Sequence, residues 1–335
     1  CREAGLLRLG VIALDGTKIR ANAALDANRT ARSLAEEVAV LFAEAETVDA
    51  AEDVLLGDRR DDVLPAELAD VGSRKARLAA CREKLAAKAA ETAARQQQKI
   101  DARAAEERAT GKGKRGRKPK PADDSVDPDA VANVTDPDSE IMKTRRGWVQ
   151  GYNGQAVVSA DQIIVAAELT TQANDVRQLV PMLGQAQAIV EAVVGEDATL
   201  GTVLADAGYW SDANAATETA ECEYLIATTK DWKQRKAMRD APPPRGRMPK
   251  GMSARERMER RLLTKRGRAL YRLRGQTVEP VFGHVKEQQG ADRFMMRGLE
   301  ACRGEWKLHA ATHNMRKLHR KSILKTGNTA KRAIQ

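Results

Sequence analysis

The sequence has few cysteines, few aromatic residues and no long apolar run. Its 335 residues include four cysteines, which stand singly at Cys1, Cys81, Cys222 and Cys302. Single cysteines without a Cys-x-x-Cys pair exclude a disulfide framework and a cysteine-based zinc site, and they fit a reducing cytoplasm. No apolar run reaches the ~18 residues of a membrane-spanning helix, and no secretory signal is evident. We therefore expect a cytoplasmic protein without a membrane partner.

Aromatic residues make up only 3% of the chain, and none occurs between Phe42 and Trp148. A stretch this long without large rings seldom builds a globular core. Residues 31–56 instead space their apolar side chains three and four apart, and residues 67–109 are rich in Ala, Lys, Glu, Arg and Gln. Both patterns favour helix. We expect 31–109 to form a helical hairpin or a short coiled coil that serves structure or dimer contacts.

Acidic residues are scarce in the last third of the chain. Residues 230–335 hold 29 Lys and Arg against 9 Asp and Glu, whereas residues 1–229 hold 28 against 38. So basic a segment indicates contact with a polyanion, most often nucleic acid. A solvated basic surface on an enzyme is the alternative.

A second basic run, GKGKRGRKPK, lies at 111–120, and residues 121–140 that follow it contain acidic but no basic residues. The core of the run, Arg115-Gly116-Arg117, resembles an AT-hook, which lies in the minor groove of A·T-rich DNA. A generic basic linker explains it equally well. We expect 110–140 to be a disordered linker, first basic and then acidic.

The segments on either side of this insertion predict an α/β fold. Apolar runs bounded by turn residues predict buried strands, and helical periodicity predicts helices between and after them. We expect residues 1–30 and 141–320 to form one catalytic unit, followed by a basic tail at 321–335. The predicted strands lie at 9–17, 151–170 (two strands), 201–208 and 222–228, and the predicted helices at 175–190, 253–270, 276–290 and 299–320.

Two of the predicted strands end in an aspartate, Asp15 in VIALD and Asp206 in TVLAD. In an α/β sheet, polar groups at the carboxyl ends of strands line the ligand crevice. Two carboxylates placed together repel unless a cation holds them, and oxygen ligands favour Mg²⁺ or Mn²⁺. Glu279, an acid within a basic stretch, is a third candidate. Each acid alone could be a cap, a turn residue or an ion-pair partner, but together they favour a metal site.

Five segments stand in a fixed order: DGTKIRANA at 15–23, GYNGQAVV at 151–158, AND at 173–175, LADAGYWSDAN at 204–214, and the long segment 271–320. In order and spacing they resemble the DDE transposases of bacterial insertion sequences. The resemblance implies a ribonuclease-H-like mixed sheet with flanking helices. Here a helical-hairpin insertion would interrupt that sheet, and a basic helical C-terminal region would follow it.

Residue by residue, the resemblance makes Asp15 and Asp206 the two catalytic aspartates and Glu279 the catalytic glutamate, together the ligands of Mg²⁺ or Mn²⁺. The implied reaction is two-metal phosphoryl transfer on DNA, in which water first frees a 3′-OH that then attacks the target. The implied activity is therefore cleavage and strand transfer of insertion-sequence ends.

The same resemblance matches Tyr271, Arg274 and Lys286 to the family's C-terminal signature, which we expect to contact DNA. Four residues separate Arg274 from Glu279, one more than in the family pattern. Lys18, in the first segment, completes the expected contacts around the acids. Arg115 and Arg117 are the expected contacts in the basic run.

The implied partner is double-stranded DNA, both element ends and target, bound by a homodimer or a higher synaptic oligomer at the nucleoid. Family members usually carry a helical DNA-binding region ahead of the first aspartate, and only 14 residues precede Asp15. Two alternatives therefore stay open. One is a truncated, catalytically silent DNA-binding relative, and the other is a helical scaffold built on 31–109.

Overall fold

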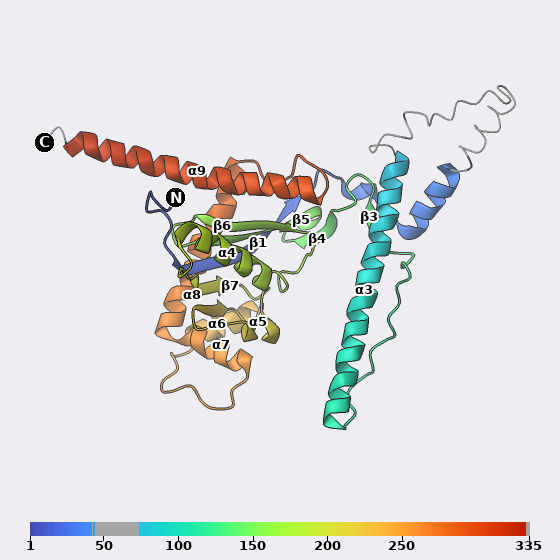
Figure 1. The fold of residues 1–335 in the computed structure, drawn as a ribbon, viewed down its shortest axis with the longest axis horizontal. Helices are drawn as coiled ribbons and strands as arrows, with labels where there is room; N and C mark the ends of the chain where they lie inside the picture. The colour runs from blue at the N-terminus through green and yellow to red at the C-terminus, as the bar shows by residue number, and fades with distance from the viewer. Residues whose placement is uncertain (42, 44–73, 333–335) are drawn as a thin grey trace. The chain divides into compact units, whose positions relative to one another are not determined.

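The computed structural model describes residues 1–41, 43 and 74–332 (Figure 1). The chain divides into two compact units, Cys1–Asn22 with Met142–Gln335, and Ala23–Ile141. We call them the sheet unit and the insertion unit. Among the described residues, no helix is both long and apolar enough to cross a membrane.

A six-stranded mixed sheet forms the centre of the sheet unit. Its strands run in the order β4-β5-β1-β7-β8, with β6 paired to β5. Strand β1 is antiparallel to β5 and parallel to β7, so it joins the two halves of the sheet. The strands are β1 (Gly10–Arg20), β4 (Glu140–Thr144), β5 (Gly147–Ser159), β6 (Ile164–Thr170), β7 (Gly201–Ala205) and β8 (Cys222–Ile226). This α/β arrangement is consistent with the expected ribonuclease-H-like fold.

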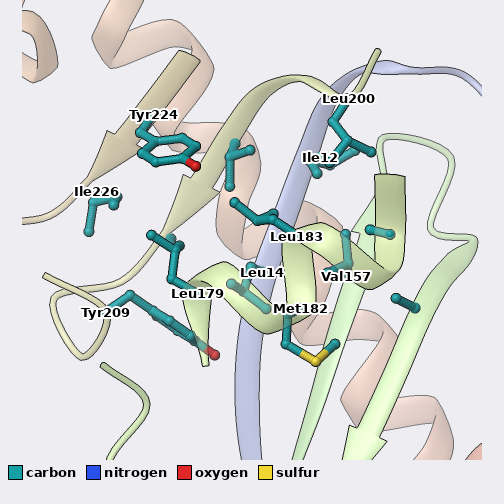
Figure 2. Close-up of a cluster of buried hydrophobic side chains, with 14 of the residues drawn as sticks. Ile12, Leu14, Val157, Leu179, Met182, Leu183, Leu200, Tyr209, Tyr224 and Ile226 are labelled. Atoms are coloured by element: carbon teal, nitrogen blue, oxygen red, sulfur yellow. The ribbon is translucent and has the colours of Figure 1, made fainter. Parts of the chain in front are cut away.

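Helix α4 (Leu179–Val194) covers one face of the sheet (Figure 2). Its Leu179 and Met182 belong to the same buried cluster as Ile12 and Leu14 of β1. Side chains two apart on a strand share a face, so the even-numbered residues of β1 point toward α4. On the opposite face, Trp306 of α9 (Leu299–Arg332) is fully buried, and its Nε1 donates to the carbonyl of Gln155 at 3.1 Å.

Short and long helices follow β7. They are α5 (Asp212–Ala216), α6 (Trp232–Asp240), α7 (Ala254–Leu263) and α8 (Lys265–Gly283), with a π-helical turn at His284–Gln288. The predicted helices at 253–270 and 276–290 are divided at a different point. Thr264 has an extended backbone, and its side chain accepts a hydrogen bond from the amide of Gly267, so it caps α8. The cap ends α7 and lets α8 run unbroken through the predicted gap.

The insertion unit has a small core of its own. Residues 31–41 are helical, and α3 spans Arg74–Thr110. Leu34 of the first helix packs with Leu78, Cys81 and Leu85 of α3. Most of the remaining part of the predicted 31–56 helix lies outside the described residues.

Two boundaries differ from expectation. Val131–Asn133, predicted to lie in a disordered linker, form strand β3, which pairs antiparallel with β2 (Asn28–Thr30). The carbonyl of Asn133 also accepts a hydrogen bond from the thiol of Cys81 on α3. These contacts explain why the segment is ordered, and why residues 23–30 belong to the insertion unit rather than to the predicted catalytic segment 1–30.

Candidate active site

Asp15 and Asp206 lie next to each other at the centre of the sheet. Strands β1 and β7 are parallel with Leu14 opposite Ala205, and each aspartate is the next residue of its chain. The strand carrying Asp15 does not end there, as predicted, but continues to Arg20 because β5 pairs with it along that length. Asp206 does directly follow its strand. The two aspartates are therefore brought together as expected.

Asp15 is a largely buried carboxylic acid with a raised pKa. Its side chain is 20% exposed, and Nη1 of Arg274 donates to its Oδ2 at 2.8 Å. Burial raises the pKa of Asp15 to about 6, Arg274 opposes that rise, and the charge of Asp206 adds to it. Burial disfavours the ionised form because it removes water, and a second carboxylate repels it. Burial, rather than the neighbouring carboxylate, is therefore the main cause of the raised pKa of Asp15.

Helix α8 brings the C-terminal signature to the two aspartates. The hydroxyl of Tyr271 donates to the carbonyl of Ala205 at 3.3 Å, one residue before Asp206. Arg274, one turn later, contacts Asp15 despite its extra residue of spacing from Glu279. Tyr271 and Arg274 thus lie on the face of α8 that meets the strands carrying Asp15 and Asp206.

Glu279 lies elsewhere on the same helix. Its side chain is exposed and folds back along α8, so that a Cβ at Gly275 would lie 3.2 Å from its Oε1. Within the described ranges, no group of three His, Cys, Asp or Glu side chains is arranged to hold a metal. The third expected acid is therefore not gathered into one cluster with Asp15 and Asp206. The donors still fit a hard divalent cation by their chemistry, since the two neighbouring carboxylates supply oxygen ligands.

Asp175 is a further carboxylate at this end of the sheet, and the sequence predicted no part for it in the site. Its Oδ1 accepts from Nδ2 of Asn153 at 2.7 Å and from Nε2 of Gln155 at 2.8 Å, and Nζ of Lys18 lies 3.6 Å away. Oδ1 of Asn153 is buried with no hydrogen-bond partner in the structure. Charged hydrogen bonds of this kind are roughly twice as strong as neutral ones. The network fixes β1 and β5 to the loop before α4.

Two glycines make room for Asp175. A Cβ at Gly16 would lie 2.7 Å from its Oδ1, and a Cβ at Gly208 would lie 3.1 Å from its Oδ2. These glycines follow Asp15 and Asp206 by one and two residues. Strand β1 at Asp15 and the turn after Asp206 therefore both close around one carboxylate. The AND segment was a signal for this residue, although its partners on distant strands were not visible.

The expected DNA-contacting lysines are half-buried beside the site. Nζ of Lys18 donates to the carbonyl of Ala173 at 2.7 Å, and Nζ of Lys286 donates to the carbonyl of Lys18 at 2.7 Å. Burial lowers the pKa of both lysines, and for Lys18 the carboxylate of Asp175 opposes that change. Arg115 lies instead in the insertion unit with Arg117.

A cavity of about 690 Å³ opens beside α8, next to the arginine that holds Asp15. Trp232, 63% exposed, lies at this cavity, and several arginines line it: Arg235, Arg239, Arg268, Arg272 and Arg274. Guanidinium groups suit phosphate oxygens because they present several donors in one plane. The cavity can therefore receive a phosphodiester close to the acidic pair.

Residues 217–319 match the family model of the transposase DDE domain. The resemblance to DDE transposases is confirmed. The matched segment carries the whole α8 signature, including Glu279, and begins after Asp206. No curated protein and no solved structure matches the chain. The DDE-domain segment thus lies directly against the strands that hold the two aspartates.

Proposed function

We propose that this protein is a DNA transposase that cleaves the ends of an insertion sequence and transfers them to target DNA. The observation that carries the proposal is the placement of Asp15 and Asp206 on neighbouring parallel strands, in contact with the helix of the matched transposase segment. Phosphoryl transfer on DNA needs concentrated negative ligands within a basic surface, and this site combines the two.

Asp15 and Asp206 are the proposed ligands of Mg²⁺ or Mn²⁺. Glu279 is the proposed third ligand, and its exposed side chain would have to turn toward the two aspartates to join them. When bound, divalent ions would activate the attacking oxygen and stabilise the leaving oxygen of the phosphodiester. The placement of Asp15 beside Asp206 supports this assignment, because two neighbouring carboxylates supply the oxygen ligands that Mg²⁺ and Mn²⁺ prefer.

The other residues act on the substrate and on the acids. Arg274 favours the ionised form of Asp15, and Tyr271 holds α8 against β7. Lys18 and Lys286 are proposed to position DNA phosphates together with the arginines of the cavity. The proposed substrate is double-stranded DNA at the element ends and the target, held by a homodimer or a larger synaptic complex at the nucleoid.

Asp206→Asn tests the proposal, with Asp161→Asn as the matched control. Asp161 also loses one charge on substitution, but its carboxylate pairs with Arg8, which is outside the candidate site. The assay is nicking of a duplex that carries the inverted repeats flanking the gene, with Mg²⁺ or Mn²⁺ added. We expect the Asp206 variant to bind the duplex like the wild type but not to nick it, and the control to do both.

A comparable rate of nicking by the Asp206 variant would remove Asp206 from the catalytic centre. Wild-type protein that binds the duplex but nicks it with neither metal would instead favour the catalytically silent relative. The two outcomes are distinct because binding and cleavage are measured separately.

A further inference from the structure

The basic run does not hang free but folds back along α3. Helix α3 ends at Thr110, and Gly111 follows with a φ of +63°. A second reversal occurs at Gly116, where φ is +103°. Both angles lie in the region that glycine adopts without a Cβ penalty. Figure 1 shows the chain returning beside the C-terminal half of α3. We call residues 111–120 the basic loop.

Helix α3 holds this loop by its main chain. The guanidinium of Arg103 donates to the carbonyls of Arg117 at 3.0 Å and Lys114 at 2.5 Å, and Gln96 donates to the carbonyl of Lys120 at 2.7 Å. Glu107 accepts from the amide of Lys114 at 2.9 Å. Because the carbonyls face the helix, the loop is anchored without using most of its side chains.

The cationic side chains are consequently left to solvent. Arg115, Arg117 and Lys118 are all exposed, and no ion pair to a carboxylate is found for them within the described part of the chain. Lys114 pairs with Glu106 of α3, and the charge of Lys118 acts at longer range on Glu107. The loop is a dense, ordered patch of positive charge, unlike a solvated linker whose charges are spread by its motion.

The neighbouring acidic segment does not neutralise this patch. Asp123 accepts from the amide of Ser125 at 2.9 Å, and Asp129 pairs with Arg32 at 3.9 Å. Neither of these two carboxylates is bonded to the loop, and within the described residues the exposed cations of the loop remain open to an external polyanion.

We propose that the basic loop is a second DNA-contacting surface, in which Arg103 positions the main chain while Arg115, Arg117 and Lys118 contact phosphates of duplex DNA. The choice of DNA rests on the proposed function. The turn at Gly116 sets Arg115 and Arg117 on a bend, whereas an arm lying in the minor groove is extended. The loop accordingly fits phosphates along the outside of the duplex, without sequence preference.

The test measures the affinity of the full-length chain for a mixed-sequence duplex over a series of salt concentrations. Each lost phosphate contact lowers the slope of log K against log salt by about 0.9, so the double variant Arg115→Ala/Arg117→Ala is expected to lower it by about 1.8. An unchanged slope would overturn the surface. Displacement of the protein by a minor-groove drug such as netropsin would overturn the phosphate assignment.

Arg103→Ala tests the positioning role, and Arg95→Ala is its control. Both arginines lie on α3 and pair with a glutamate four residues away, but Arg95 makes no contact with the loop in the structure. Both variants lose one charge, so they differ only in the hydrogen bonds that Arg103 donates to the carbonyls of the basic loop. We expect Arg103→Ala to weaken binding and Arg95→Ala to leave it nearly unchanged, with equal helix content by circular dichroism. If the two variants weakened DNA binding equally, Arg103 would have no positioning role for the basic loop.

The proposal for the basic loop and the proposed transposase function can fail independently of each other. The double variant keeps the acids and α8 intact, so its nicking is expected to fall only as far as its binding to the duplex falls. If the double variant shows the smaller salt slope but the wild type never nicks the duplex, the loop proposal stands and the transposase proposal fails. If the wild type nicks normally but the double variant has an unchanged slope, the transposase proposal stands and the loop proposal fails.

Discussion

Replacing Asp15 by Asn should stabilise the protein while abolishing its activity. The pKa of Asp15 rises from its ordinary value of 3.8 to about 6, chiefly because the carboxyl is buried. An acid whose pKa is higher in the folded state than in the unfolded state favours folding only while it is protonated. Stability is therefore lost as the pH rises from about 4 to about 6. Asparagine resembles the protonated acid in shape and has no charge to bury.

The magnitude follows from the size of the pKa change. At about 1.4 kcal/mol per pKa unit, the ionised form of Asp15 costs the folded state up to about 3 kcal/mol above pH 6. Asp15→Asn is expected to recover most of this amount at pH 7.5 and almost none near pH 4. For a unit of this size the gain corresponds to roughly 5–10 °C in melting temperature.

The assay is denaturant unfolding of both proteins at pH 4, 6 and 7.5, beside the nicking assay. Asp161→Asn is a control of opposite sign, because the hydrogen bond from Arg8 lowers the pKa of Asp161. That variant should lose stability at pH 7.5 relative to the wild type. An Asp15 variant that is no more stable than the wild type at pH 7.5, or equally more stable at every pH, would refute the reasoning.

Three further outcomes are expected. Arg274→Gln removes the charge that opposes the rise in the pKa of Asp15, so the pKa of Asp15 should rise further, by roughly 1–3 units. The rate of nicking should then fall at pH 7 and recover toward pH 9. A pH profile of nicking that does not shift would contradict this. Asp175→Asn weakens the charged hydrogen bonds to its two amide donors and should cost about 1–3 kcal/mol in denaturant unfolding. Limited trypsin digestion should cut first within 111–120, and the fragments should migrate together on a native gel because β1 pairs with β5 and β7; separation of the fragments would contradict the shared sheet.

The strands were predictable because each is a local signal. Buried strands need continuous apolar runs, and VIAL and TVLA have them. Strand β4 was not predicted, since only Met142 of its five residues is buried and EIMKT shows no clear alternation. The boundary between α7 and α8 depends on the cap at Thr264, which interrupts neither helix in composition. Such boundaries are set by a single backbone conformation rather than by a pattern.

The candidate site was predictable only in part. Two aspartates after apolar runs could be expected to meet if their strands were parallel neighbours, and they are. The contact between Arg274 and Asp15 spans 259 positions of sequence, and no local spacing encodes it. The helical position of Glu279 was expected to complete the cluster, but its orientation on α8 depends on how the whole helix packs.

Gly16, which follows Asp15, supports one structural interpretation from the sequence and another from the structure. From sequence, Gly16 suggested a turn that ends the strand. In the structure β1 continues through Gly16, whose φ is not positive, so no turn requires the glycine. The glycine is required because the side chains of Asp175 and Gln155 approach it closely and leave no space for a Cβ. A glycine inside a strand often marks such an approach. Together with Gly208 near Asp206, it indicates that the chain at both aspartates is shaped around Asp175, a neighbour that neither segment contains.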